Sequence, residues 1–261
     1  MSGLISIITD FGERDGWVGT MKGVILGINP GAKLVDISHQ ITPGDVREAC
    51  LVLQASFPFF PKGTVHLCVV DPGVGSARRA IAVETSHYKF VGPDNGLFTP
   101  IYQREDFQAV EITNRELFYS PHPSFTFHGR DIFAPVAAHL SQGLALKEVG
   151  PRIKDLVRIE LPSPGVGPGE ITGEVIYIDR FGNLITNIAK ELFDRKVGSS
   201  PFKLRIGRAI LKTLSRSYAD VPRGKLLAHW GSWGYLELSV NQGSAQRFLS
   251  ATKGTKLTIN Y

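Results

Sequence analysis

A short segment rich in proline and glycine constrains the fold of this chain most strongly. Residues 161–169 read LPSPGVGPG and hold three proline and three glycine residues. Proline removes a backbone donor and glycine favours disordered backbone, so this composition is typical of a connection between domains. We therefore expect a first domain at 1–160, a linker at 161–169 and a second domain at 170–261.

Before the linker, short apolar runs alternate with a helical pattern. Strand-like runs occupy residues 4–10, 33–38, 64–71 and 80–86, and apolar residues recur at helical spacing from Trp17 to Ile28. This alternation predicts an α/β domain with a mostly parallel sheet. Ligands of such sheets bind beyond the carboxyl ends of the strands. Asp10 and Asp71 both fall at such an end.

After the linker, the pattern changes to short strands alone. The runs are GEVIYID, NLITNI, KLRIG, LLAHWGS, YLELSV and KLTINY, separated by turn residues such as Gly, Asn and Pro. Several short strands with turn residues between them are typical of a small barrel or sandwich. We expect a small all-β, barrel-like second domain.

Composition narrows the class of protein and its partners. Apolar residues make up 43% of the chain and charged residues 20%, which indicates a folded globular protein. The net charge is +5, and no basic run is interleaved with aromatics, which argues against a nucleic-acid partner. No signal peptide is recognisable, and no window approaches the roughly 20 apolar residues of a membrane span. With only two cysteines, Cys50 and Cys68, in apolar contexts, we expect a cytoplasmic protein.

The segment VVDPGVGSARR at 69–79 is the first candidate site. Asp71 follows an apolar strand, two glycines allow close approach of a ligand, and Arg78 comes seven residues later. A loop of this length can fold back and place the guanidinium against the carboxylate, although an ordinary turn explains Asp71 equally well. GVGSAR also matches half of a dinucleotide-binding fingerprint, but the third glycine is missing.

Two further clusters combine polar and aromatic residues. SFTFHGRD at 124–131 places His128 beside glycine and charges; it is either a structural histidine or a group that holds a water molecule. IDRFGNLITNI at 178–188 is either a hairpin turn or a recognition loop. The sequence contains no HExxH motif, no zinc-type cysteine spacing and no GxSxG elbow, so we expect no metal and no serine nucleophile.

Taken together, five motifs resemble one family. They are TDFG at Thr9, VDPGVGSARR at Val70, PDNGL at Pro93, FHGRD at Phe127 and DRFGNLITNI at Asp179. They resemble the S-adenosyl-L-methionine (SAM) hydroxide adenosyltransferases, which are related to bacterial fluorinase and chlorinase. The resemblance implies attack of water or hydroxide on the ribose C5′, with adenosine and L-methionine as products. SAM is then the substrate and no cofactor is needed.

The resemblance also implies roles for individual residues. The catalytic triad of the family falls on Asp71, Arg78 and His128. The substrate-binding residues that it implies are Asp10 at the ribose, Asp179 and Ser232 at methionine, Phe181 and Asn183 on the adenine and methionine side, and Phe127 in the FHGRD motif. The family forms homotrimers whose sites lie between the first domain of one subunit and the second domain of its neighbour.

Two departures bear on the reaction. The halogenases carry Tyr where this chain has Asp71 and His128, which argues against halide as the nucleophile. Trp233 replaces the arginine that follows the serine in fluorinase, so recognition of the methionine carboxylate must differ. The alternatives are a SAM-dependent halogenase, a non-catalytic protein that binds SAM or adenosine, and an enzyme using a dinucleotide.

Overall fold

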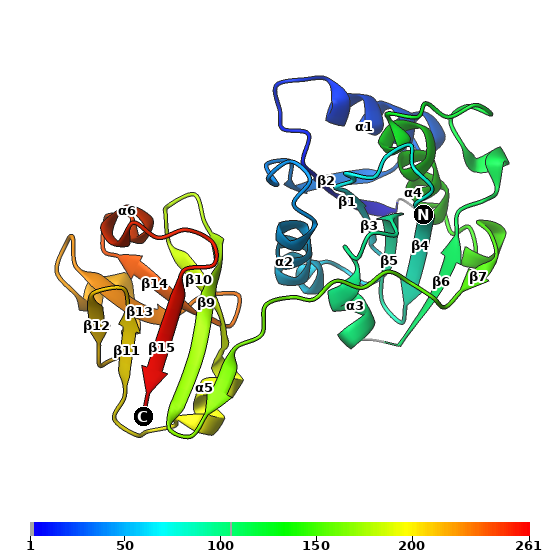
Figure 1. The fold of residues 1–261 in the computed structure, drawn as a ribbon. Coiled ribbons are helices and arrows are strands. Elements are labelled where there is room, and N and C mark those ends of the chain that lie inside the picture. Colours follow the sequence, from blue (N-terminus) through cyan, green and yellow to red (C-terminus); the bar gives the residue numbers. More distant parts are fainter. Residues whose placement is uncertain (1–2, 105) are drawn as a thin grey trace. The chain divides into compact units, whose positions relative to one another are not determined.

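The computed structural model describes residues 3–104 and 106–261 (Figure 1). The chain forms two compact units, Met1–Glu160 and Leu161–Tyr261. No helix in the described part of the chain is long and apolar enough to cross a membrane. Each unit has its own buried apolar core, so we describe them separately.

The first unit is built on one mixed sheet with the strand order β2-β1-β3-β5-β4-β6-β7. The strands are β1 (Leu4–Thr9), β2 (Lys33–Ser38), β3 (Val65–Val69), β4 (Ala80–Thr85), β5 (Lys89–Pro93), β6 (Phe107–Glu111) and β7 (Arg152–Ile153). β1 runs parallel to β2 and β3, and β3 runs parallel to β5. The remaining pairs, β4 with β5, β4 with β6 and β6 with β7, are antiparallel.

The prediction of a mostly parallel sheet is therefore wrong for half of the sheet. β4 ends at Thr85 and β5 begins at Lys89, which leaves a connection of residues 86–88. A parallel pair needs a crossover of about a dozen residues or more, whereas so short a connection can only make a hairpin. The antiparallel pairing of β4 with β5 follows from this chain length.

Helices cover the sheet of the first unit. They are α1 (Trp17–Ile28), α2 (Val46–Ser56), α3 (Thr99–Arg104) and α4 (Ala134–Ser141), with short 3₁₀ turns at Phe57–Phe59, Arg115–Leu117 and Leu146–Glu148. α1 and α4 pack on the face of the sheet that carries Ile5, Ile7 and Leu67, and Met21 lies fully buried between them. A π-helical turn, Gly129–Phe133, leads directly into α4.

The second unit is an antiparallel sheet that curves into a nearly closed barrel, as expected (Figure 1). Its strands are β8 (Gly165–Gly167), β9 (Glu170–Ile178), β10 (Leu184–Ala189), β11 (Lys203–Ile206), β12 (Ala209–Leu211), β13 (Leu226–Trp230), β14 (Tyr235–Val240) and β15 (Lys256–Asn260). Its helices are α5 (Lys190–Lys196), α6 (Ala245–Leu249) and a 3₁₀ turn at Tyr218–Asp220. Part of the segment expected to be a linker forms a strand, β8. Its backbone pairs with the first residues of β9.

Candidate functional site

Asp71 and Arg78 face each other across one loop at the carboxyl end of β3. The Arg78 Nε donates to Asp71 Oδ1 at 3.0 Å, and Nη2 donates to Oδ2. The two side chains are only 10% and 5% exposed. A bidentate ion pair with so little exposure is geometrically specific. The fold-back that the seven-residue spacing predicts is thus present.

His128 completes a line of three side chains. The Arg78 Nη2 lies 2.7 Å from His128 Nδ1. A guanidinium can only donate, so Nδ1 accepts, and a neutral His128 must carry its proton on Nε2. The Arg78 guanidinium also lies 5.1 Å from the ring centroid of Phe133, which fixes it from another side. The arginine is therefore the centre of the triad, with the carboxylate and the imidazole on either side.

The position of His128 depends on the loop before α4. Asp131 is 1% exposed and accepts from the backbone of Ser124 at 2.7 Å and from Arg130 Nε at 2.6 Å. His128 itself immediately precedes the π-helical turn. Such turns occur frequently at functional sites because they alter the direction of side chains on a helix. Asp131 anchors the loop, and the turn sets where the imidazole lies.

The loop of Asp71 lies close against the loop of His128 at a single glycine. Gly75 has φ +77°, and a Cβ added there would lie 2.3 Å from the carbonyl oxygen of Phe125. Both the left-handed backbone and the close approach require glycine at this position.

Replacing Gly75 by alanine should therefore push the two loops apart. We expect the first unit to lose about 1–3 kcal/mol of unfolding free energy, measured by denaturant unfolding. Gly63 offers a matched control in the same unit, because it has φ +86° but nothing within 4 Å of an added Cβ. Equal losses for Gly75→Ala and Gly63→Ala would show that only backbone strain matters and that the loop contact does not.

Asp10 lies at the end of the neighbouring parallel strand. Thr9 pairs with Val69, so Asp10 and Asp71 follow adjacent strand ends. The Asp10 Oδ2 accepts from the backbone of Gly44 at 2.8 Å, and an added Cβ on Gly44 would lie 3.6 Å from Pro72. The structure therefore brings Asp10 to the same edge of the sheet as the triad.

Phe127 has a different environment from the other predicted residues. It is 9% exposed, and its ring packs edge-on against Phe11 and Trp17 at centroid distances of 5.9 and 5.2 Å. The Arg130 guanidinium lies 5.3 Å from the same ring. Phe127 belongs to the core beneath the TDFG turn and fixes the backbone next to His128.

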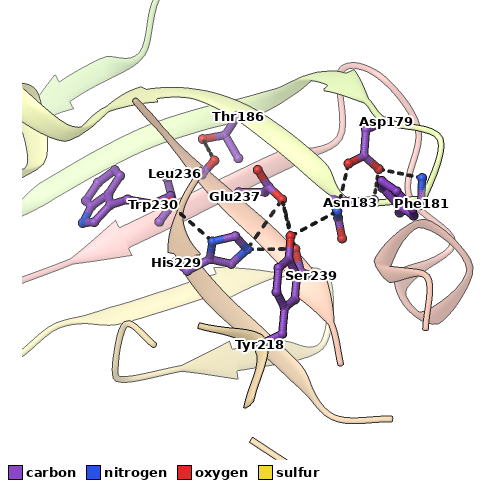
Figure 2. Close-up of polar contacts among 10 residues, drawn as sticks. All are labelled: Asp179, Phe181, Asn183, Thr186, Tyr218, His229, Trp230, Leu236, Glu237 and Ser239. Carbon is purple, nitrogen blue, oxygen red and sulfur yellow. Dashed lines mark hydrogen bonds and ion pairs between the residues drawn. The ribbon is translucent and has the colours of Figure 1, made fainter. Parts of the chain in front are cut away.

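In the second unit, Asp179, Phe181 and Asn183 share one turn between β9 and β10. The Asp179 carboxylate accepts from the backbone of Phe181 and of Asn183, each at 2.9 Å, and from Asn183 Nδ2 at 2.8 Å (Figure 2). Asn183 is buried at 5% exposure, whereas the Phe181 ring is 76% exposed. The turn is rigid and presents an aromatic ring at its tip.

Ser232 lies at the other end of the same pair of strands. Leu184 of β10 pairs with Leu238 of β14, and Ala189 pairs with Tyr235. The Asp179 turn precedes Leu184, and the exposed Ser232 precedes Tyr235. The register of the two strands shifts between Ile185 and Ala189, so β10 uses more residues than β14 over this span. No hydrogen bond joins Ser232 to the Asp179 turn among the residues that the structure describes, whereas the ring of the adjacent Trp233 lies 5.0 Å from that of Tyr177.

A polar cluster beside the Asp179 turn was missed by the sequence reasoning. Tyr218 donates to Glu237 Oε1 at 3.4 Å and accepts from Asn183 Nδ2 at 3.5 Å. Behind them, His229 Nε2 lies 3.0 Å from Ser239 Oγ (Figure 2). Burial raises the pKa of Glu237, opposed by the charge of His229. The sequence signals this cluster only by the mixture of polar and aromatic residues in HWGSWGYLELSVNQGSA at 229–245, in which Glu237 stands at a position typical of an exposed strand residue.

No group of three or more His, Cys, Asp or Glu side chains is arranged to hold a metal ion among residues 3–104 and 106–261. Residues 5–150 match the model of the SAM hydroxide adenosyltransferase N-terminal domain, and residues 173–258 match that of the C-terminal domain.

Individual proteins resemble the chain over its whole length. An (R)-S-adenosyl-L-methionine hydrolase from Salinispora tropica is 40% identical, covering 98% of this chain and 97% of that protein. A fluorinase from Actinoplanes sp. is 30% identical, covering 98% and 97%. A conserved protein of known structure from Thermotoga maritima is 43% identical with a TM-score of 0.93, covering 98% of this chain and 100% of that one. The chain belongs to the SAM hydroxide adenosyltransferase family.

Proposed function

We propose that this protein hydrolyses SAM to adenosine and L-methionine. In this reaction a water oxygen forms a bond to C5′ of the ribose, the C5′–S bond breaks with its electron pair going to sulfur, and one proton is released. The line of Asp71, Arg78 and His128 carries the proposal, because it places a carboxylate and an imidazole at one ligand-binding edge of the sheet. The greater identity to the hydrolase than to the fluorinase supports water as the nucleophile.

The residue types fit this chemistry. The sulfonium is already a good leaving group, so catalysis needs an oriented, partly desolvated water rather than an acid at sulfur. His128 Nδ1 accepts from Arg78, so its Nε2–H serves as a donor to the water oxygen. Asp71 keeps unused lone pairs beside those that Arg78 occupies, which makes it the proton acceptor by elimination.

The predicted substrate-binding residues are assigned to parts of SAM as follows. Asp10 would bind the ribose hydroxyls, since it lies at the edge of the sheet next to the triad. Asp179 and Ser232 would bind the methionine part of the substrate, and Phe181 and Asn183 would line its adenine and methionine side, as membership of the family implies. Phe127 would act on substrate binding through the placement of His128, because its own ring is buried.

The resemblance further supports a homotrimer in which the first unit of one subunit and the second unit of its neighbour form each site. Sedimentation equilibrium of the purified chain tests this proposal directly. A mass three times that of the chain supports it, and a monomer that retains turnover contradicts it.

Chromatography of SAM incubated with the protein tests the reaction. We expect adenosine and methionine in equal amounts, with and without a chelator. A 5′-halo product that outgrows adenosine when chloride, bromide or fluoride is added would instead show a halogenase. A rise in thermal stability with SAM but no methionine release would show a binding protein.

The pH dependence of turnover should report the state of His128. Burial lowers the pKa of His128 below its ordinary value of 6.5, and the charge of Arg78 lowers it further. The neutral imidazole therefore persists as the pH falls through 6.5 and is lost only below that value, where a proton on Nδ1 removes the acceptor of the Arg78 Nη2–H and disrupts the triad. We expect kcat to stay constant from about pH 8 down to 6.5 and to fall at lower pH. A midpoint at or above 6.5 in the kcat profile contradicts this assignment.

A further inference from the structure

One face of β14 carries polar residues in a place that is buried. Leu236, Leu238 and Val240 point into the barrel core, so Glu237 and Ser239 lie on the opposite face. That face is nevertheless covered, since Glu237 is 8% exposed and Ser239 is 0% exposed. Burying a polar group costs free energy unless the group is hydrogen-bonded, so Glu237 and Ser239 need hydrogen-bond partners.

The network is present and centres on the Glu237 carboxylate. Ser239 Oγ donates to Glu237 Oε1 at 3.2 Å, and the facing His229 Nε2 lies 3.5 Å from the same oxygen (Figure 2). Room for the carboxylate depends on Gly231, where an added Cβ would lie 2.3 Å from Glu237 Oε2. Because so many groups hold the carboxylate in place, its free lone pairs have a fixed direction.

Tyr218 connects the Glu237 carboxylate to the Asp179 turn by hydrogen bonds. Its hydroxyl has one proton, which it donates to Glu237 Oε1, so an oxygen lone pair faces Asn183 Nδ2. The Asn183 amide then directs its donors to Tyr218 and to Asp179 Oδ2. Among the residues that the structure describes, none donates to Asn183 Oδ1, which leaves that acceptor for a ligand.

We propose that Glu237 and Tyr218 are positioning residues that fix the orientation of the Asn183 side chain, so that its carbonyl oxygen is the atom offered to the substrate. This inference rests on the proposed function only in that Asn183 contacts SAM. Without the tyrosine hydroxyl, the Asn183 amide keeps only its bond to Asp179 Oδ2, so its orientation is held less firmly. The substrate group bound there is accordingly a hydrogen-bond donor.

The sharpest variant is Tyr218→Phe, which removes one oxygen and leaves the ring. We expect KM for SAM to rise about 5- to 10-fold, as for loss of one hydrogen bond to a bound group, with kcat within about twofold. Tyr88→Phe is the matched control, because it removes a hydroxyl that donates to the Phe60 carbonyl in the first unit. That control should leave KM unchanged.

A double-mutant cycle separates positioning from a general structural role. In an Asn183→Ala background the hydroxyl has nothing to orient, so Tyr218→Phe should add no further rise in KM. Glu237→Gln keeps an acceptor for the hydroxyl and should stay near wild type, whereas Glu237→Leu should match Tyr218→Phe. Calorimetric affinities for SAM should show the same pattern without depending on turnover.

The outcomes distinguish this inference from the proposed reaction. If wild type binds SAM but forms no adenosine, the hydrolase function fails, and the calorimetric cycle alone decides the positioning role. If Tyr218→Phe leaves both KM and affinity unchanged, or if its effect adds fully to that of Asn183→Ala, the positioning role is overturned while the hydrolase function stands.

Discussion

Replacing Asp71 by asparagine is expected to lower kcat by about 10²–10⁴-fold, the range typical for loss of a general base. The side chain is 5% exposed and asparagine has nearly the same shape, so the loop can keep its conformation. The amide cannot accept a proton from water, and it leaves Arg78 with one acceptor oxygen in place of two. Steady-state kinetics with adenosine as the measured product give kcat directly.

Asp94→Asn provides the control for this prediction. Asp94 is also buried and is also paired with an arginine, since Arg79 Nε donates to its Oδ2 at 3.0 Å. It lies outside the triad, so kcat should stay within a few fold of wild type even if stability falls. Similar losses of kcat in both variants would mean that turnover depends on any buried Asp–Arg pair, and would contradict the role of Asp71 as the proton acceptor.

Removal of the Arg78 side chain should destabilise the first unit as well as abolish turnover. Arg78→Ala leaves the buried Asp71 carboxylate without its counter-charge, which typically costs about 3–5 kcal/mol. Denaturant unfolding, followed for the first unit, measures this loss. Turnover should fall at least as far as in Asp71→Asn, because the arginine holds both of the other groups.

A double variant separates stability from activity here. In Asp71→Asn with Arg78→Met, neither partner is left as an unpaired charge, so most of the lost stability should return. Activity should stay as low as in the single variants. If the double variant is no more stable than Arg78→Ala, the unpaired charge of Asp71 is not the cause of the lost stability.

The strands and helices of the first unit follow largely from hydrophobic periodicity. Residues 4–9, 33–38 and 80–85 form strands close to where their apolar runs predict them, and Trp17–Ile28 forms a helix. The direction of the strands was harder, because periodicity does not encode it. The three-residue connection between β4 and β5 decides it for that pair, and β5 was not recognised as a strand from its sequence KFVGP.

The candidate site was partly predictable for a similar reason. Asp71 and Arg78 belong to one loop, so their spacing alone allowed the ion pair that the structure contains. His128 is fifty residues further along the chain than Arg78, and only the family resemblance linked it to them. Local sequence cannot predict a contact between loops that tertiary packing brings together.

Strand register and burial explain what remained hidden in the second unit. The pairing of β10 with β14 contains a register shift between Ile185 and Ala189, which no local pattern in the sequence indicates. Glu237 sits at an alternate position of β14 that would ordinarily face solvent, and it is buried because other parts of the chain cover that face. Alternation indicates the two faces of a strand but not whether a second segment covers one of them.

The destination of the water oxygen tests the central claim most directly. The protein is incubated with SAM in ¹⁸O-labelled water, and the products are examined by mass spectrometry. If water attacks the ribose C5′, adenosine carries one ¹⁸O at its 5′-hydroxyl and methionine carries none. Unlabelled adenosine, or cleavage that leaves sulfur attached to the ribose, would contradict attack at C5′ and with it the assigned role of Asp71, Arg78 and His128.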